Sequence, residues 1–229
     1  MKKMQYDSVA EKYHAETKAD LTANNEEKLK TEMVERPKIE NSDGWNVLDL
    51  GCGSGIHLEF FARTYPDIHS ATGTDVSEEM IRIAKREPTT TKIDYLIADM
   101  DSLPLANDYF DFIFSRNALH YSTDLQKTIA EVSRVLKPGG KLFFQVSHPM
   151  HNLFLKKSKN YLVKETLHFV IQGGKTEVSH PTFTVEEYVN AITSSNLRIV
   201  ELKEYDGRTS VVDGYTVPVI LALLVTKPL

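Results

Sequence analysis

The chain has 229 residues, a length that fits one large domain or one domain with an inserted cap. Its net charge of −5 argues against binding nucleic acid or an anionic membrane through bulk electrostatics, and its single cysteine excludes an internal disulfide framework and a cysteine-rich zinc site. No apolar stretch follows the N-terminal lysines and no run is long enough to cross a membrane, so we expect a cytoplasmic protein without a secretory signal.

The N-terminal forty residues favour helix. Aromatic and small apolar residues recur at helical spacing from Tyr6 to Tyr13, which predicts an amphipathic helix over residues 5–16. The charged stretch at 17–36 favours a further helical segment, and Pro37 would end it. We expect residues 1–40 to form a helical cap on the domain.

A strand, a tight turn and a helix are predicted around residues 46–62. Val47, Leu48 and Leu50 form a short apolar run that is typical of a buried parallel strand, and the apolar residues at 56–62 have helical spacing. Glycines at alternate positions separate the two segments. Such a turn presents bare backbone N–H groups and a helix N-terminus to a ligand. The glycines are Gly51, Gly53 and Gly55.

The spacing of these glycines restricts the ligand. A dinucleotide fingerprint needs its third glycine where this chain has Ile56, and the turn lacks the Gly-Lys pair of a P-loop. Asp49 stands two residues before the first glycine, where a carboxylate would repel a pyrophosphate. It suits a cationic ligand such as S-adenosylmethionine, which carries a sulfonium and an ammonium group. A purely structural turn is the alternative.

The stretch Val47–Gly55 resembles, residue for residue, the first motif of the class I S-adenosylmethionine-dependent methyltransferases, and further matches extend from about Tyr6 to His148. The resemblance implies a Rossmann-like α/β fold, a doubly wound, seven-stranded, mostly parallel sheet with one antiparallel strand. It also implies S-adenosyl-L-methionine as the cofactor, held at the glycine turn, and an N-terminal helix that covers the cofactor and brings an aromatic ring to the methyl-transfer site. The residues implicated in addition to the three glycines are Tyr13, Asp49 and Cys52.

The second predicted strand, over residues 69–76, contains an acid near its end, Asp75. An acid at this place in a nucleotide-binding fold accepts hydrogen bonds from a ribose diol. Ser77 would cap the helix that follows, and a simple capping role is the alternative for Asp75. The resemblance to the family's ribose motif implies that Val76 lies at the cofactor and that Met80 packs against the adenine.

Two more strands are predicted, over residues 93–98 and 109–115. The resemblance implies that Asp99, after the first of them, accepts from the adenine amino group and that the backbone N–H of Met100 meets a ring nitrogen. Open α/β sheets bind ligands at the carboxyl ends of their strands. The residues that follow the strand at 109–115 are therefore expected at the ligand-binding edge of the sheet. The family uses this end for the methionine part of the cofactor and for the acceptor. The candidates there are Ser115, Asn117, His120 and Tyr121, and a packed loop histidine is the alternative for His120.

A helix and a fifth strand are predicted next. Thr123 and Gln126 have the spacing of a capping box, and apolar residues through Leu136 form a helical stripe. The sequence Leu-Lys-Pro-Gly-Gly at 136–140 is expected to end this helix and lead into a strand over 141–147. It resembles a late motif of the family whose role is structural.

The connection at 148–183 is long and irregular. A run at 161–171 and a Gly-Gly turn at 172–175 predict a β-hairpin. Because long loops in compact domains often act as lids, we expect a cap that governs substrate specificity, with a purely structural hairpin as the alternative. His148 and His151 are candidate catalytic residues; two histidines without a nearby carboxylate or cysteine are weak evidence for a metal site, and we expect none.

The remaining chain favours a helix and two strands. Thr184 and Glu187 have capping-box spacing, and strand-like runs cover 197–205 and 217–226. These would complete the sheet with an antiparallel hairpin. We therefore expect one domain, with a cofactor-binding core at 41–147, the substrate cap at 148–183 and a C-terminal helix and hairpin at 184–229.

These observations predict an enzyme that transfers a methyl group from S-adenosyl-L-methionine to a small-molecule acceptor, similar to the quinone-biosynthesis methyltransferase group. We expect a monomer or homodimer without a nucleic-acid or membrane partner. The candidates for a general base or for substrate contacts are His120, Tyr121, His148 and His151. Two alternatives stay open: a non-catalytic or modified-cofactor S-adenosylmethionine-binding protein, and a nicotinamide oxidoreductase, which the glycine spacing disfavours.

Overall fold

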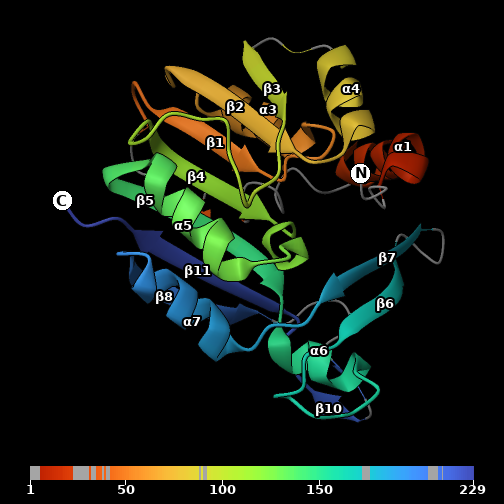
Figure 1. The fold of residues 1–229 in the computed structure, drawn as a ribbon. Helices are drawn as coiled ribbons and strands as arrows, with labels where there is room; N and C mark the ends of the chain where they lie inside the picture. The colour runs from red at the N-terminus through yellow and green to blue at the C-terminus, as the bar shows by residue number, and fades with distance from the viewer. Residues whose placement is uncertain are drawn as a thin grey trace. The chain divides into compact units, whose positions relative to one another are not determined.

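The computed structural model describes residues 6–22, 31, 35–37, 39, 42–87, 89, 92–171, 176–205, 211–212 and 214–229 (Figure 1). The predicted helix end at Pro37 and the Gly-Gly turn at 172–175 depend on residues outside these ranges. The chain divides into two compact units, which are considered in turn. The first comprises residues 1–100 and 170–178, and the second comprises residues 101–169 and 179–229.

The fold is built on a seven-stranded sheet with the strand order β3-β2-β1-β4-β5-β11-β8. In the first unit, β2 pairs in parallel with both β1 and β3. In the second unit, β4 and β5 are parallel, whereas β11 runs antiparallel to both β5 and β8. The predicted mostly parallel sheet with one antiparallel strand is confirmed. The strands are β1 (Asn46–Leu50), β2 (Ser70–Asp75), β3 (Ile93–Ile97), β4 (Phe110–Arg116), β5 (Leu136–Ser147), β8 (Arg198–Tyr205) and β11 (Ile220–Thr226).

The helices of the first unit follow from the apolar patterns in its sequence. All five residues of β1 are buried, as expected for an interior parallel strand. Helix α3 (Ile56–Thr64) buries Leu58 and Phe61 completely, which are spaced to share one face. Helix α4 (Glu78–Arg86) begins after Ser77, whose hydroxyl accepts the N–H of Met80 at 3.2 Å, so the predicted cap is confirmed.

A short 3-10 turn, η1 (Asp7–Val9), leads into helix α1 (Ala10–Thr22), which confirms the predicted N-terminal helix. Figure 1 shows α1 beside α4. Ala10 on α1 is buried in one apolar cluster with two residues of α4, and Tyr6 and Tyr13 pack against this cluster. The aromatic spacing noted in the sequence is therefore the apolar contact of α1 with α4.

The helix of the second unit, α5 (Leu125–Val135), corrects one prediction. Its N-cap is Asp124, whose carboxylate accepts the N–H of Lys127 at 3.1 Å, and not Thr123. The Thr123 hydroxyl instead donates to Asp101 at 3.0 Å. The Asp101 carboxylate also accepts from the hydroxyl groups of Ser122 and Thr128, so it is held in place at the start of this helix.

The Leu-Lys-Pro-Gly-Gly segment also lies differently from the prediction. Helix α5 ends at Val135, and residues 136–140 already belong to strand β5. The register between β4 and β5 shifts within this segment, between Phe110 and Phe112. Gly139 has φ 79°, which favours glycine. The segment is therefore an irregular start of the strand.

The connection at 148–183 contains more regular structure than its sequence suggested. It forms a helix, α6 (Pro149–Leu155), and a two-stranded sheet of β6 (Thr166–Ile171) and β7 (Thr176–Pro181). Lys156 ends α6 with its side chain buried, and its ammonium donates to the carbonyls of Asn160, Tyr161 and Val163. The hairpin prediction is confirmed for the paired strands.

The C-terminal residues form helix α7 (Val185–Ser194), then β8, the short pair β9 (Val211–Val212) and β10 (Tyr215–Thr216), and β11. The predicted capping box is confirmed, because Thr184 and Glu187 exchange hydrogen bonds at 3.1 and 2.8 Å. In Figure 1, α7 lies beside α5 in this unit. None of the described helices combines the length and apolarity that crossing a bilayer requires.

Candidate functional site

The three glycines of the turn between β1 and α3 adopt left-handed backbone conformations. Gly51, Gly53 and Gly55 have φ of 80°, 52° and 81°, a region that L side chains rarely adopt. The N–H groups of Gly51 and Cys52 donate to the carbonyl of Thr74 at 2.8 and 2.9 Å, which fixes the turn to the end of β2. The turn is therefore a rigid feature of the first unit.

Two of these glycines face different surroundings. A Cβ at Gly55 would lie 2.7 Å from Cζ of Tyr95, so the side chain of Tyr95 fills the space on that side. A Cβ at Gly53 would meet nothing within 4 Å. The backbone at Gly53 is thus open to an approaching ligand, while the backbone at Gly55 is closed by β3.

Asp75 joins this turn to the start of α4. Its Oδ2 accepts the N–H of Gly53 and its Oδ1 accepts the N–H of Ser77, both at 2.9 Å. Burial raises the pKa of Asp75, and the backbone N–H donors of Ser77, Gly53 and Val76 oppose that rise. A carboxylate offers about four acceptor positions, so about one remains for a hydroxyl donor beyond these three backbone donors. Asp75 is therefore more than a helix cap, because it also holds the turn.

Asp49 and Cys52 are both buried and do not lie on the outer surface of the turn. Asp49 is 2% exposed and stands opposite Gly73 in the β1–β2 register. Cys52 is 4% exposed, and burial, with smaller contributions from Asp49 and Asp75, raises the pKa of its thiol well above the usual value. The thiol is therefore protonated and unreactive at neutral pH.

The other residues predicted in the first unit lie along the ends of β2 and β3. Met80 is buried in the cluster that also contains Ala10, against which Tyr13 packs, whereas Val76 is 38% exposed. Asp99 is exposed and Met100 is half-buried just beyond β3. The N–H of Ala98 donates to the carbonyl of Asp75 at 2.9 Å, which ties the end of β3 to that of β2.

In the second unit the predicted residues follow β4. Ser115 is buried on the strand, and Asn117 is exposed with φ 54°, its N–H donating to the carbonyl of Gln145 at 2.9 Å. His120 and Tyr121 belong to the 3-10 turn η3 (Leu119–Tyr121), with ring centroids 4.5 Å apart. The turn therefore places these two rings together.

A third ring completes this cluster, and it was missed from the sequence. His180, on β7, has its ring centroid 4.5 Å from that of His120 and 5.6 Å from that of Tyr121. Sixty residues separate it from His120, and in the sequence it is a single histidine in a short strand. Only the pairing of β6 with β7 could have suggested its position.

The two histidines of this cluster are neutral in opposite tautomers. Burial, and then His180, lowers the pKa of His120 well below its usual value, and burial lowers the pKa of His180. The N–H of Ser147 donates to Nδ1 of His120 at 3.4 Å, so the proton of His120 is on Nε2. Nδ1 of His180 lies 2.7 Å from the carbonyl of Pro181 and therefore carries the proton, which leaves the lone pair on Nε2.

His148 and His151 have a different setting. Nδ1 of His148 accepts the N–H of Met150 and caps α6, and its Nε2 lies 2.8 Å from the Glu204 carboxylate. Burial lowers the pKa of both histidines, against the effect of Glu204 on His148. Within the described residues, no group of three or more potential ligands could hold a metal ion.

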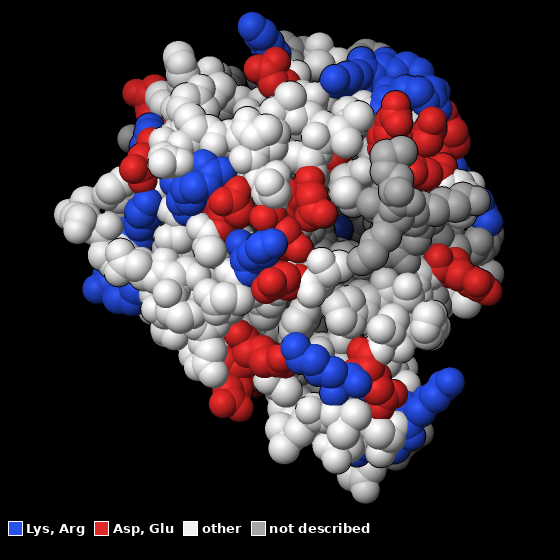
Figure 2. Space-filling view, viewed as in Figure 1, with Lys and Arg blue, Asp and Glu red and all other residues white. Residues whose placement is uncertain are grey.

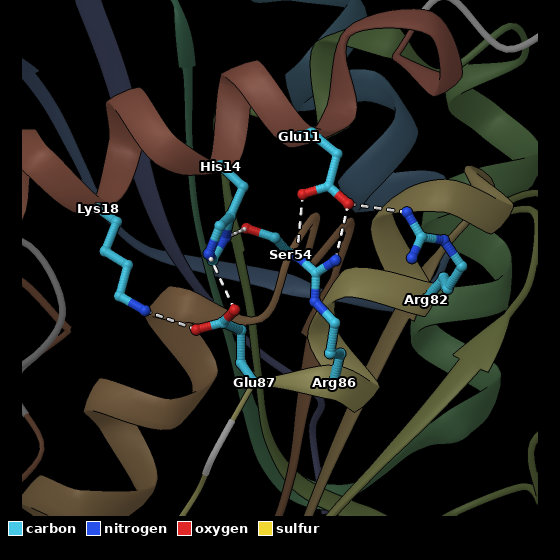
Figure 3. A network of polar contacts seen from close by, with 7 residues as sticks. All are labelled: Glu11, His14, Lys18, Ser54, Arg82, Arg86 and Glu87. Atoms are coloured by element: carbon cyan, nitrogen blue, oxygen red, sulfur yellow. Dashed lines mark hydrogen bonds and ion pairs between the residues drawn. The ribbon is translucent and has the colours of Figure 1, made fainter.

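A polar network in the first unit was also missed from the sequence (Figure 3). Glu11 on α1 pairs with Arg82 and Arg86 of α4 at 2.8 Å, and these guanidinium groups, Arg86 first, lower its pKa to about 2. His14 and Lys18 of the same helix lie at 3.3 and 2.6 Å from Glu87. The apolar periodicity that predicts this helix carries no information about its charged contacts.

Comparison with known proteins decides the family. The family model described as a methyltransferase domain matches residues 48–144. A protein of Methanocaldococcus jannaschii, itself described as uncharacterised, is 31% identical over 181 residues, which cover 73% of this chain and 68% of that protein. The ubiquinone/menaquinone biosynthesis C-methyltransferase UbiE of Shewanella halifaxensis is 34% identical over 141 residues, 58% of this chain and 56% of that enzyme.

The chain belongs to the S-adenosylmethionine-dependent methyltransferase family. Among solved structures, a methyltransferase of Methanosarcina mazei with this cofactor dependence superposes with a TM-score of 0.62 at 26% identity, over 82% of this chain and 94% of that one. The chain spans about half the length of several curated relatives that it matches. The methyltransferase fold predicted from the sequence is thereby confirmed.

The residues of this methyltransferase fit the family's cofactor, S-adenosyl-L-methionine. The open space over Gly53 admits a ligand against the turn, and the remaining acceptor position of Asp75 suits a hydroxyl donor of a ribose. The buried Asp49 carboxylate, below the turn, favours a cationic ligand over a pyrophosphate.

Proposed function

We propose that this methyltransferase transfers a methyl group from S-adenosyl-L-methionine to a small-molecule acceptor. The observation that carries the proposal is Asp75, whose two oxygens connect the open glycine turn with the start of α4. In this proposal Asp75 also accepts from a ribose hydroxyl, Met80 lies beside the adenine, and Asp99 with the backbone of Met100 binds the adenine edge.

The charge of the protein supports a small acceptor. The net charge is −5, and on the face shown in Figure 2 the Lys and Arg side chains are interspersed with Asp and Glu. A protein that binds the phosphate backbone of a nucleic acid would present a continuous basic surface. UbiE is named as a C-methyltransferase, and a second relative as a malonyl-[acyl-carrier protein] O-methyltransferase. Related chains thus differ in the atom that they methylate.

The acceptor residues in this proposal are those of the second unit. His120, Tyr121 and His180 form a neutral aromatic cluster, which suits an apolar or aromatic acceptor. Ser115 and Asn117 would contact the methionine part of the cofactor. We assign acceptor specificity to the segment 148–183, which supplies His180 as well as the candidates His148 and His151.

The chemistry requires little from the protein beyond positioning. The bound cofactor supplies an electrophilic methyl group on a sulfonium. The residues around the acceptor align its nucleophilic atom and exclude water. Where that atom carries a proton, a neutral imidazole can accept it through its unprotonated nitrogen. That nitrogen is Nε2 in His180 and Nδ1 in His120.

Calorimetry with S-adenosylhomocysteine and with NAD tests the cofactor assignment. We expect binding of the first and none of the second; the reverse result would identify a nicotinamide enzyme. A screen of small phenols, quinols, amines and carboxylic acids with isotopically labelled methyl donor then tests transfer, with Asp75→Ala as the inactive control. Cofactor binding without transfer to any acceptor would instead support a non-catalytic S-adenosylmethionine-binding protein.

A further inference from the structure

One face of the N-terminal segment carries polar residues at a helical repeat. They stand three or four positions apart, which places them on one side of η1 and α1. Each contacts another part of the first unit: Asp7 accepts from the Ser77 hydroxyl at 2.6 Å, Glu11 pairs with Arg82 and Arg86, and Lys18 pairs with Glu87. We call this set, with His14, the α1 polar stripe; its members are Asp7, Glu11, His14 and Lys18.

His14 differs from the rest of the stripe, because it reaches the glycine turn. Its Nδ1 lies 2.9 Å from the Ser54 hydroxyl, and its Nε2 lies 3.3 Å from the Glu87 carboxylate (Figure 3). Among the contacts described for the stripe, the others end on α4 or on the residues that flank it. His14 is 6% exposed, so its imidazole lies inside the protein.

Ser54 is well placed to transmit this contact. It stands between Gly53, whose backbone is open to a ligand, and Gly55, whose backbone is closed by Tyr95. Both glycines have positive φ, so the conformation of the turn depends on what holds it from each side. The Asp75 carboxylate accepts the N–H of Gly53, and the His14 ring forms a hydrogen bond with the hydroxyl of the next residue, Ser54.

The same N-terminal segment touches the other end of the proposed nucleoside site. Asp7 bonds to the Ser77 hydroxyl, and the Ser77 N–H donates to Asp75. Ala10 and Tyr13 lie in or against the cluster that contains Met80. Docking of α1 therefore orders both the glycine turn and the start of α4.

We propose that His14 is a positioning residue for cofactor binding, which fixes the glycine turn through Ser54 and thereby couples the docking of α1 to the occupancy of the site. This inference rests on the proposed cofactor function. The coupling is reciprocal: a cofactor bound at the turn stabilises the docked α1 by the same factor by which docked α1 strengthens cofactor binding.

Two conservative variants separate the contact of His14 with Ser54 from its contact with Glu87. In His14→Asn, the short amide retains a polar atom near the position of Nδ1 and so keeps the contact with Ser54. In His14→Gln, the longer amide retains one near Nε2 and keeps the contact with Glu87. We expect His14→Gln and Ser54→Ala each to weaken S-adenosylhomocysteine binding about tenfold by calorimetry, and His14→Asn to stay within about threefold of the wild type.

A double variant tests the coupling directly. If His14 acts through Ser54, the variant combining His14→Gln with Ser54→Ala binds no more weakly than either single variant. Lys18→Ala, which removes an outer contact of the same stripe, is the matched control and should bind as the wild type does. A merely structural role for His14 would lower the unfolding midpoint of both His14 variants without separating their affinities.

Hydrogen exchange provides a readout that does not depend on any variant. In the wild type, S-adenosylhomocysteine should slow amide exchange in residues 10–18 of α1 as well as in residues 51–55. Wild-type protein that binds no S-adenosylhomocysteine would refute the proposed function itself. Normal wild-type binding, with equal affinities for His14→Asn and His14→Gln or with unchanged exchange in α1, would overturn the role of His14 alone.

Discussion

The carboxylate of Asp75 accepts the backbone N–H of Gly53 at 2.9 Å, across 22 positions of sequence. This bond joins the end of one strand to the turn that follows its neighbour. Because the second oxygen accepts from Ser77, one side chain fixes three backbone segments at the proposed nucleoside site.

Asp75→Asn should weaken S-adenosylhomocysteine binding by about 1.5–3 kcal/mol, the range for a hydrogen bond to a charged group. The amide oxygen can replace one carboxylate oxygen, but the amide NH2 would face a backbone N–H that needs an acceptor. Titration calorimetry measures the loss, and circular dichroism confirms the fold. Asp67→Asn, at an exposed carboxylate, is the control. Unchanged affinity would mean that Asp75 serves only the fold.

Alanine at Gly55 and at Gly53 should act on different properties. Both substitutions place a side chain at positive φ, which costs about 1–2 kcal/mol of stability. Gly55→Ala additionally meets the Tyr95 ring, so we expect a further loss of about 1–3 kcal/mol in unfolding free energy. Gly53→Ala should keep more stability but lose cofactor affinity, because its methyl group occupies the open space. Urea unfolding and calorimetry distinguish the two, and equal stabilities would contradict the packing of Tyr95.

Stability should fall on acidification because of the buried histidine cluster. The pKa of His120 is well below 6.5 in the folded state and near 6.5 in the unfolded chain, so the unfolded state binds more protons in that window. Unfolding free energy therefore rises with pH up to about 6.5, by at most about 1.4 kcal/mol per pH unit for each such histidine. His120→Gln should reduce this slope between pH 5 and 6.5 in urea titrations. A steeper or unchanged slope for His120→Gln would argue against a buried neutral ring.

Lys156→Met should loosen the segment that follows α6. The buried ammonium donates to three carbonyls, and methionine would leave these without that donor. We expect a loss of about 1–3 kcal/mol in unfolding free energy and faster limited proteolysis near residues 157–163. Lys157→Met, at an exposed neighbour, provides the comparison. Equal proteolysis of the two variants would show that the carbonyls find other partners at little cost.

Much of the fold was predictable because its signals are local. The apolar residues Val47, Leu48 and Leu50 predict a strand that is fully buried, and Ser77 and Thr184 begin the helices that their capping patterns predict. The glycines of the turn adopt the positive φ for which glycine is suited. Asp75 was identifiable as a site candidate because its place at the end of the second strand is set by order along the chain.

The errors arose where neighbours in space compete with neighbours in sequence. Thr123 had the spacing of an N-cap, but its hydroxyl donates to Asp101 and Asp124 caps the helix. The Leu-Lys-Pro-Gly-Gly segment had the composition of a helix end, yet pairing with β4 draws it into the strand. In both cases a partner more than twenty residues away decides between two locally acceptable conformations.

The sequence by itself determined the family, the glycine turn, the acid that follows the second strand and the amphipathic N-terminal helix, because each is written in contiguous residues with a fixed period. Only the tertiary structure decided that His180 joins His120 and Tyr121, and that His14 bridges Ser54 and Glu87. Each of these contacts joins side chains forty or more residues apart. Their formation depends on strand pairing and helix docking, which no local pattern encodes.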